Sequence, residues 1–280
     1  MKVGLSTPLV NPFATPEYIR TLGTAAEDRG FHSIWVPEHV VLFDSYESVY
    51  PYADTGKIPI GPESGVLDPF VVLSNLAAVT SRIRLGTGIC LLPQRNPVYT
   101  AKEAATVDWL SNGRLDLGIG VGWLREEFEA LHVPFERRGE RCDAYIEVMR
   151  ALWCDEVSQY ESEFYSLPPT RQYPKPVQQP HVPVHIGGHS NAALRRVAEH
   201  GQGWYAFNQS PEEMRERLAK LDQLLEARGR TRSEIQVGVC PYTVPADAGV
   251  QKGYEDAGVD EVTLHAVARD EAGLIATLDG

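Results

Sequence analysis

The chain has 280 residues, of which 43% are hydrophobic and 23% charged, a composition typical of globular proteins with a sizeable core. Its formal net charge of −12 opposes binding to nucleic acid and to anionic membranes, because the summed field repels both. We see no secretory signal in the first ten residues, MKVGLSTPLV, and no apolar run approaches the roughly 18 residues of a membrane span. The cysteines have neither CxxC nor metal-finger spacing, so we expect reduced, mostly buried thiols, no metal site and a cytoplasmic location.

Strands and helices are predicted to alternate along the chain. Short runs rich in β-branched or aromatic residues predict strands near 2–6, 33–37, 83–90, 115–121, 183–187, 203–207, 235–240 and 261–266. Helices are predicted near 16–29, 69–81, 97–111, 139–153, 191–200, 211–228, 249–257 and 270–278. Eight such units favour a single domain over residues 1–280 with the (β/α)8 TIM barrel fold; an open doubly wound sheet is the alternative.

Two long segments interrupt this alternation. Residues 40–66, rich in tyrosine, proline and glycine, follow the second strand, where barrel enzymes build their sites, so we interpret them as a lid with aromatic contacts. Residues 155–182 are rich in proline and precede the fifth strand. We expect this second segment to be an excursion that packs on the barrel.

The stretch RLDLGIGVGW at residues 114–123 resembles a nucleotide-binding loop but has the wrong spacing. A dinucleotide fingerprint needs G-x-G-x-x-G at a strand–helix turn, whereas these glycines recur every second residue, which is the strand period. Gly118, Gly120 and Gly122 should therefore face the barrel interior and leave room for a flat ligand, as should Gly86 and Gly88. The alternative is that these glycines offset bulky neighbours in the core.

Two blocks then carry a family resemblance. Residues 81–123, SRIRLGTGICLLPQRNPVYTAKEAATVDWLSNGRLDLGIGVGW, and residues 173–204, YPKPVQQPHVPVHIGGHSNAALRRVAEHGQGW, resemble the luciferase-like monooxygenase superfamily. They look most like its branch of oxidoreductases that use the deazaflavin coenzyme F420. The resemblance implies a TIM barrel with a flavin or deazaflavin ring over the C-terminal ends of the strands.

The resemblance also implies where the coenzyme binds. The pair Gly88-Ile89 matches a bulge with a non-proline cis peptide that supports the ring, and Gly120 and Gly122 provide clearance for it. Gly187, Gly188 and Ser190 match the segment that binds the coenzyme phosphate, where a helix N-terminus offers free N–H groups and a positive dipole end. The alternative for this segment is a plain turn that uses glycine for its geometry.

Glu38 and His39 are the acid–base candidates. They lie just past the second strand, and an acidic residue followed by histidine stands at this place in deazaflavin-dependent members. Histidine titrates near neutrality and can exchange a proton with a substrate oxygen while hydride passes to or from the coenzyme. We expect His189 to be a ligand contact and His185 a core residue. Trp123 stands where sugar-phosphate dehydrogenases of the family carry glutamate, which argues against a sugar phosphate and suggests an apolar pocket wall.

Three functions remain open from the sequence. The first is an F420-dependent oxidoreductase that transfers hydride to or from a small molecule. The second is an FMN-dependent monooxygenase of the same superfamily, which takes reduced flavin from a partner enzyme. The third is a flavin-binding protein without catalysis. The helix predicted at 69–81 is apolar on more than one face, and the family commonly pairs through this region, so we also expect a homodimer.

Overall fold

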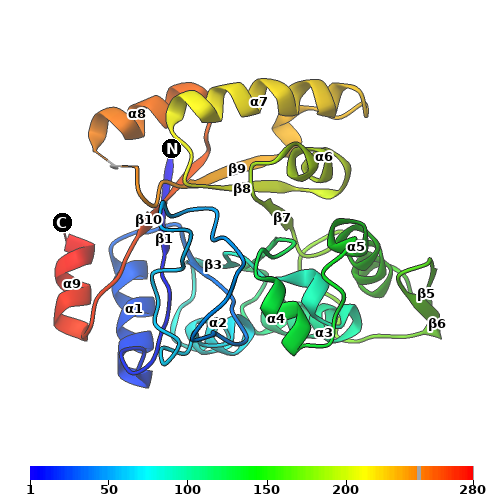
Figure 1. Ribbon diagram of the computed structural model, residues 1–280, viewed down its shortest axis with the longest axis horizontal. Helices are drawn as coiled ribbons and strands as arrows, with labels where there is room; N and C mark the ends of the chain where they lie inside the picture. Colours follow the sequence, from blue (N-terminus) through cyan, green and yellow to red (C-terminus); the bar gives the residue numbers. More distant parts are fainter. Residues whose placement is uncertain (245–246, 280) are drawn as a thin grey trace.

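Eight parallel strands close into a barrel, and helices cover its outside (Figure 1). The computed structural model describes residues 1–244 and 247–279. Around the barrel the strands follow the order β1-β10-β9-β8-β7-β4-β3-β2, which confirms the predicted TIM barrel. The bounds of these strands are β1 Lys2–Ser6, β2 Ser33–Val36, β3 Arg84–Thr87, β4 Leu115–Ile119, β7 Val184–Gly187, β8 Gly203–Phe207, β9 Gln236–Cys240 and β10 Glu261–His265.

The helices start largely where their capping residues predict. The side chains of Thr15, Asp68, Asn96 and Ser210 each accept a hydrogen bond from the first turn that follows, and each is followed by proline. Within the described part of the chain, no helix is long and apolar enough to cross a membrane. The helices are α1 Pro16–Asp28, α2 Pro69–Val79, α3 Pro97–Leu110, α4 Arg125–Ala130, α5 Arg138–Cys154, α6 Asn191–His200, α7 Pro211–Glu226, α8 Ala248–Ala257 and α9 Glu271–Asp279.

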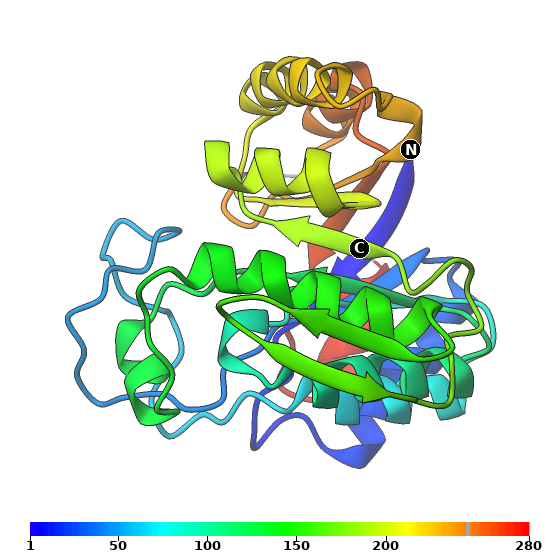
Figure 2. The same ribbon diagram turned by 90° about the vertical axis from the view of Figure 1, so that its right-hand side faces the viewer.

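Two short strands and one short α-helix were not predicted. The insertion at 155–182 contains an antiparallel hairpin of β5 (Ser158–Glu161) and β6 (Ser166–Thr170), which lies beside α5 (Figure 2). Two prolines within β6 hid this strand, since proline is tolerated only at a sheet edge. Helix α4 is six residues long and mostly polar, so its sequence shows little helical periodicity.

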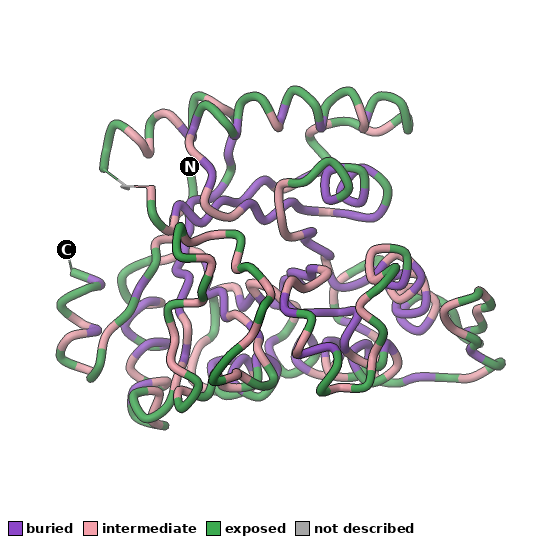
Figure 3. The backbone as a smooth tube through the Cα atoms, in the orientation of Figure 1, coloured by how far each residue is buried: buried purple, intermediate pink, exposed green. Residues whose placement is uncertain are grey.

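The main core lies between the barrel wall and the helices. The wall is largely buried and the outer helix faces are exposed (Figure 3). Leu117 and Ile119 of β4 point outward into this core, as their alternation with glycine predicts. A smaller cluster of Trp35, Tyr205 and Cys240 forms a separate hydrophobic core. All four cysteines are free, and Cys154 alone of them is exposed.

The inner glycines make room for the side chains of the barrel itself. A Cβ at Gly86 would overlap the indole ring of Trp35, and one at Gly118 would overlap the carbonyl oxygen of Thr87. The alternative interpretation, that glycine offsets a bulky neighbour, therefore accounts for Gly86, while Gly118 allows close approach of the backbone of β3. Strand β4 ends at Ile119, two residues earlier than predicted, so Gly120 and Gly122 lie beyond it.

A buried polar network lies deeper in the barrel. Asp116 of β4 accepts hydrogen bonds from the guanidinium of Arg84 at 2.5 and 2.6 Å, and its carboxylate lies 3.3 Å from His185 Nε2. His185 also packs edge-on against Trp35, with ring centroids 5.3 Å apart. It is 2% exposed, which confirms it as a core residue.

Candidate active site

The predicted site residues gather at the C-terminal ends of the strands, which we call the mouth of the barrel. The Gly88-Ile89 peptide directly after β3 is cis, as the family resemblance implies. The side chain of Ile89 lies between the ends of β4 and β7, because a Cβ at Gly120 would overlap it and one at Gly187 would approach it at 2.8 Å. Gly122 adopts φ 76°, a left-handed conformation that favours glycine. Thus Ile89, Gly120 and Gly187 form one surface at the mouth.

The turn between β7 and α6 leads into a capped helix N-terminus. Gly188 adopts φ 92°, and the Ser190 side chain caps α6 by accepting from the Ala193 N–H at 3.1 Å. The remaining N–H groups of a first helical turn face outward without intrahelical partners. Arg217 of α7 lies beside this turn, and its guanidinium donates to Asn191 Oδ1 at 3.5 Å. Burial, together with the charge of Arg217, lowers the pKa of His189.

His39 is paired with a buried carboxylate. Its Nδ1 lies 3.3 and 3.4 Å from the two carboxylate oxygens of Glu127, a residue of α4 that is 0% exposed. The same carboxylate accepts from the Val40 N–H at 2.7 Å and from Gln94 Nε2 at 3.1 Å. Gln94 is also buried, and its Oε1 has no hydrogen-bond partner among the described residues. Because an ionised carboxylate only accepts, Nδ1 of His39 is the donor in this pair, and Nε2 has no hydrogen-bond partner among the described residues.

Glu38 points to a different set of partners. One carboxylate oxygen accepts from the Leu91 N–H at 2.6 Å, and the other forms an ion pair with Arg95. Arg95 also pairs with Glu103 of α3 at 2.6 Å. Burial raises the pKa of Glu38, and Arg95 opposes that rise. Glu38 thereby ties the segment after β2 to the segment after β3.

The long segment at 40–66, which we call the lid loop, contacts the mouth through aromatic rings. Tyr50 packs against Trp123 at a centroid distance of 5.2 Å, and Tyr52 packs against Phe207 at 4.8 Å. Trp123 in turn lies 6.0 Å from the ring of His39. The aromatic contacts predicted for this loop are therefore present. Figure 2 shows the loop beside α4 at the left of the molecule.

Glu126 holds the lid loop on α4. Its Oε1 accepts from the backbone N–H groups of Glu47 at 2.7 Å and of Ser48 at 3.2 Å, while the Ser48 hydroxyl accepts from the Arg125 N–H. Burial would raise the pKa of Glu126, but hydrogen bonds from Ser48 and the loop backbone hold it at about 2. The carboxylate therefore stays charged at neutral pH.

We predict that Glu126→Ala loosens the lid loop. Loss of two charge-assisted hydrogen bonds should speed amide hydrogen exchange at residues 42–60 by about tenfold, because such bonds contribute about 1.5–3 kcal/mol. Hydrogen exchange read by mass spectrometry measures this directly. Glu129→Ala, an exposed change on the same helix, is the control and should leave the loop unchanged. Equal exchange rates in both variants would show that Glu126 does not hold the loop.

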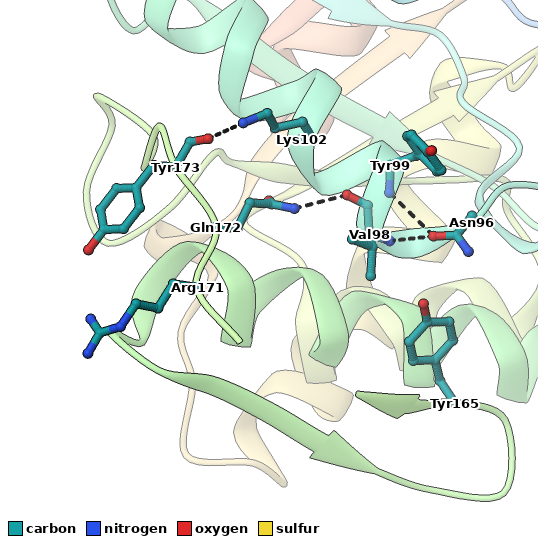
Figure 4. A pocket seen from close by; sticks show the side chains of 8 residues that line it. All are labelled: Asn96, Val98, Tyr99, Lys102, Tyr165, Arg171, Gln172 and Tyr173. Atoms are coloured by element: carbon teal, nitrogen blue, oxygen red, sulfur yellow. Dashed lines mark hydrogen bonds between the residues drawn. The ribbon is translucent and has the colours of Figure 1, made fainter. Parts of the chain in front are cut away.

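A groove of about 510 Å³ lies elsewhere, beside α3 and the insertion (Figure 4). Tyr99 and Lys102 of α3 line it together with Tyr165, Arg171 and Tyr173. Lys102 donates to the carbonyl oxygen of Tyr173, which ties the insertion to the barrel as expected. None of the predicted site residues lines this groove.

Comparison with known proteins places this barrel in a family. The family model described as luciferase-like monooxygenase matches residues 1–264. The chain belongs to the luciferase-like monooxygenase family. Its members are oxidoreductases and monooxygenases that act on small molecules, which confirms the coarse function that the sequence predicted.

Individual relatives within this luciferase-like family differ in what is known of them. An uncharacterized protein of Mycobacterium tuberculosis is 34% identical over 243 residues, covering 87% of this chain and 83% of the relative. The oxygenase component of a flavin-dependent trigonelline monooxygenase from Acinetobacter baylyi is 32% identical over 163 residues, or 58% of this chain and 40% of that protein. The structure of an F420-dependent secondary alcohol dehydrogenase in complex with an F420-acetone adduct superposes with a TM-score of 0.77. It covers 99% of this chain and 97% of that one at 16% identity, which shows a shared fold.

Three residues near the site were not predicted from the sequence: Glu127, Gln94 and Arg217. Glu127 lies three residues after Leu124 and next to Phe128, and both of these apolar residues are buried. That spacing could have marked it as an inward-facing carboxylate. Gln94 and Arg217 gave no comparable signal, because only the fold brings them to the mouth.

Proposed function

We propose that this protein is an F420-dependent oxidoreductase that transfers hydride between the deazaflavin and a small organic substrate in the cytoplasm. The observation that carries the proposal is the pairing of His39 with the buried carboxylate of Glu127 at the mouth of the barrel. Hydride transfer to or from a carbon that bears oxygen requires one proton to move with it. An oriented histidine with a free Nε2 supplies that proton transfer.

The residues at the mouth fit the coenzyme. Ile89, Gly120 and Gly187 present a narrow surface for the ring, and the N-terminus of α6 with Arg217 suits its phosphate. Two polar atoms there, Gln94 Oε1 and His189 Nδ1, are buried without a hydrogen-bond partner in the part of the chain that the structure describes. When bound, the deazaflavin would supply the hydride acceptor or donor.

In alcohol oxidation, Nε2 of His39 would take the proton of the substrate hydroxyl while hydride leaves the substrate carbon. In the reverse direction, His39 would return the proton to the carbonyl oxygen. Glu127 orients the imidazole and stabilises its protonated form. Glu38 was predicted as a catalytic residue together with His39. Its partners, Leu91 and Arg95, favour a positioning role, in which it fixes the bulge after β3 beneath the ring.

We predict that Arg217→Gln weakens coenzyme binding about tenfold, because it removes a cation beside the phosphate site. Arg215→Gln is the matched control, since Arg215 is exposed on the same helix and changes the net charge equally. The dissociation constants come from calorimetric titration at fixed salt. Equal losses in the two variants would point to a general charge effect instead of a local contact.

The identity to a flavin-dependent trigonelline monooxygenase favours a second candidate, an FMN-dependent monooxygenase that receives reduced flavin from a partner enzyme. The two functions differ in whether the reaction requires oxygen. A hydride transferase oxidises its substrate under strictly anaerobic conditions, with one coenzyme reduced per turnover, whereas a monooxygenase consumes oxygen. Screening alcohols with F420 in a glove box and following loss of coenzyme absorbance provides the test. Turnover that depends on oxygen would exclude hydride transfer to F420.

We also propose that two copies of the chain pair through α2 and α3. Four apolar side chains on these helices are more than half exposed: Val71, Tyr99, Trp109 and Leu110. Such a patch is typical of an interface. Light scattering should give twice the chain mass of 31.0 kDa, and the double variant Val71→Glu, Leu110→Glu should give the single mass. A monomeric unmodified protein would refute the pairing.

A further inference from the structure

Five aromatic rings form a continuous row across the mouth of the barrel. Trp123 contacts Tyr50 at 5.2 Å, Tyr50 contacts Tyr52 at 5.5 Å, and Tyr52 contacts Phe207 at 4.8 Å. Phe207 then contacts Tyr242 at 4.8 Å. We call Trp123, Tyr50, Tyr52, Phe207 and Tyr242 the aromatic row.

The two ends of the row belong to the barrel and its middle belongs to the lid loop. Phe207 ends β8, while Trp123 and Tyr242 lie in the segments that follow β4 and β9. Tyr50 and Tyr52 come from the lid loop and fill the place between Trp123 and Phe207. A molecule that enters this place must move both tyrosines and replace their contacts.

The contacts to be replaced include ring contacts between the lid loop and the barrel. The pairs that join the lid loop to the barrel are edge-to-face, at interplanar angles of 61° and 65°. Aromatic pairs in this arrangement gain stabilisation beyond the burial of area, because the positive edge of one ring meets the negative face of another. A planar ring reproduces this gain, and a saturated ring of the same size does not.

The charges around the row disfavour an anion. The carboxylate of Glu127 lies beside His39 at the Trp123 end. In the described part of the chain, two cations lie near this end of the row. Lys57 Nζ lies 3.9 Å from the ring centroid of Tyr46 and donates to the Tyr46 carbonyl oxygen, and Arg138 Nε donates to the Gly122 carbonyl oxygen at 3.1 Å. Arg217 lies by α6, where we assign it to the coenzyme phosphate. A carboxylate or phosphate on the substrate would thus meet the like charge of Glu127, while both nearby cations already donate to backbone carbonyl oxygens.

We infer that the substrate carries a planar ring without negative charge, which binds between Trp123 and Phe207. This inference rests on the proposed function, because it places the reacting carbon and its oxygen at the Trp123 end, next to His39. The aromatic row then determines specificity, and Tyr50 and Tyr52 close over the bound ring.

The test uses the coenzyme-loaded protein and calorimetric binding of four probes. Comparison of benzyl alcohol with cyclohexylmethanol tests whether a planar ring binds more tightly than a saturated one. Benzoate tests whether a negative charge weakens binding, and benzyltrimethylammonium tests whether a positive charge strengthens it. We expect benzyl alcohol or benzyltrimethylammonium to bind about tenfold more tightly than cyclohexylmethanol and benzoate. Trp123→Ala and Phe207→Ala should each remove most of that preference, while Tyr173→Ala, an exposed ring on the insertion, should keep it.

Two outcomes overturn the inference: equal binding of benzyl alcohol and cyclohexylmethanol, or benzoate binding at least as tightly as benzyl alcohol. Coenzyme binding is measured first, in the same calorimeter. Failure of the coenzyme to bind refutes the proposed function. Normal coenzyme binding without a preference for planar over saturated rings refutes only the aromatic substrate class. Circular dichroism of each variant separates a lost contact from a lost fold.

Discussion

Replacing His39 with alanine is expected to lower kcat by about 10²–10⁴-fold, the usual contribution of a positioned acid–base group. The coenzyme dissociation constant should change little, because His39 lies across the mouth from the α6 N-terminus and contacts Glu127 and Trp123 instead. Glu127→Gln should cause a smaller loss, since the amide oxygen still accepts from Nδ1 but no longer stabilises a protonated imidazole.

The matched control for His39 is His132→Asn. His132 is an exposed histidine in the turn after α4, at φ 55°, a conformation that asparagine tolerates. Steady-state kinetics with an identified substrate and coenzyme titration of each variant measure both quantities. An unchanged kcat in His39→Ala would show that His39 has no role in catalysis. Loss of coenzyme binding in this variant would show that His39 binds the coenzyme instead.

Asp116→Ala is expected to reduce the free energy of unfolding by about 3–5 kcal/mol, because it leaves Arg84 and His185 without their common buried partner. That is a large share of the 5–15 kcal/mol that stabilises a typical domain. Urea denaturation measures the change. Glu156→Ala removes the exposed ion pair with Arg171 and should cost less than about 1 kcal/mol. A loss in Asp116→Ala no larger than in this control would contradict the assigned role.

The pH dependence of stability is a second, independent test of the contribution of Asp116. Burial alone would raise the pKa of Asp116, but hydrogen bonds and charges from His185 and Arg84 lower it from 3.8 to about 2. The stabilisation is therefore present above about pH 4 and is lost as the pH falls toward 2. The variant Asp116→Asn should lack this component of acid destabilisation. Urea midpoints between pH 2 and 5 compare the two proteins.

Local sequence signals predicted the barrel well because each unit has its own chemistry. The β-branched runs mark strands, and cap-proline pairs such as Asn96-Pro97 mark helix starts, so every barrel strand lies within a few residues of its predicted range. The role of the inner glycines could not be predicted without the tertiary structure. From the sequence they indicated clearance for a ligand, whereas Trp35 occupies the space at Gly86 and Ile89 occupies the space at Gly120.

The site was predictable only where it follows from strand order. His39, Ile89 and Gly187 lie at strand ends, and parallel strands bring such ends together. Glu127 and Arg217 reach the mouth from α4 and α7, so their partners depend on how those helices pack. Glu38 is adjacent to His39 in sequence, yet it has different partners, because neighbouring residues after a strand point in different directions.

The most direct test of the central claim is a parallel titration of the purified protein with F420 and FMN under identical salt and pH. The mouth of the barrel, with Ile89 between two glycines and Arg217 beside α6, is proposed to hold the deazaflavin. We predict saturable binding of F420 with a dissociation constant at least tenfold below that of FMN. Tighter binding of FMN would contradict the account and favour the monooxygenase.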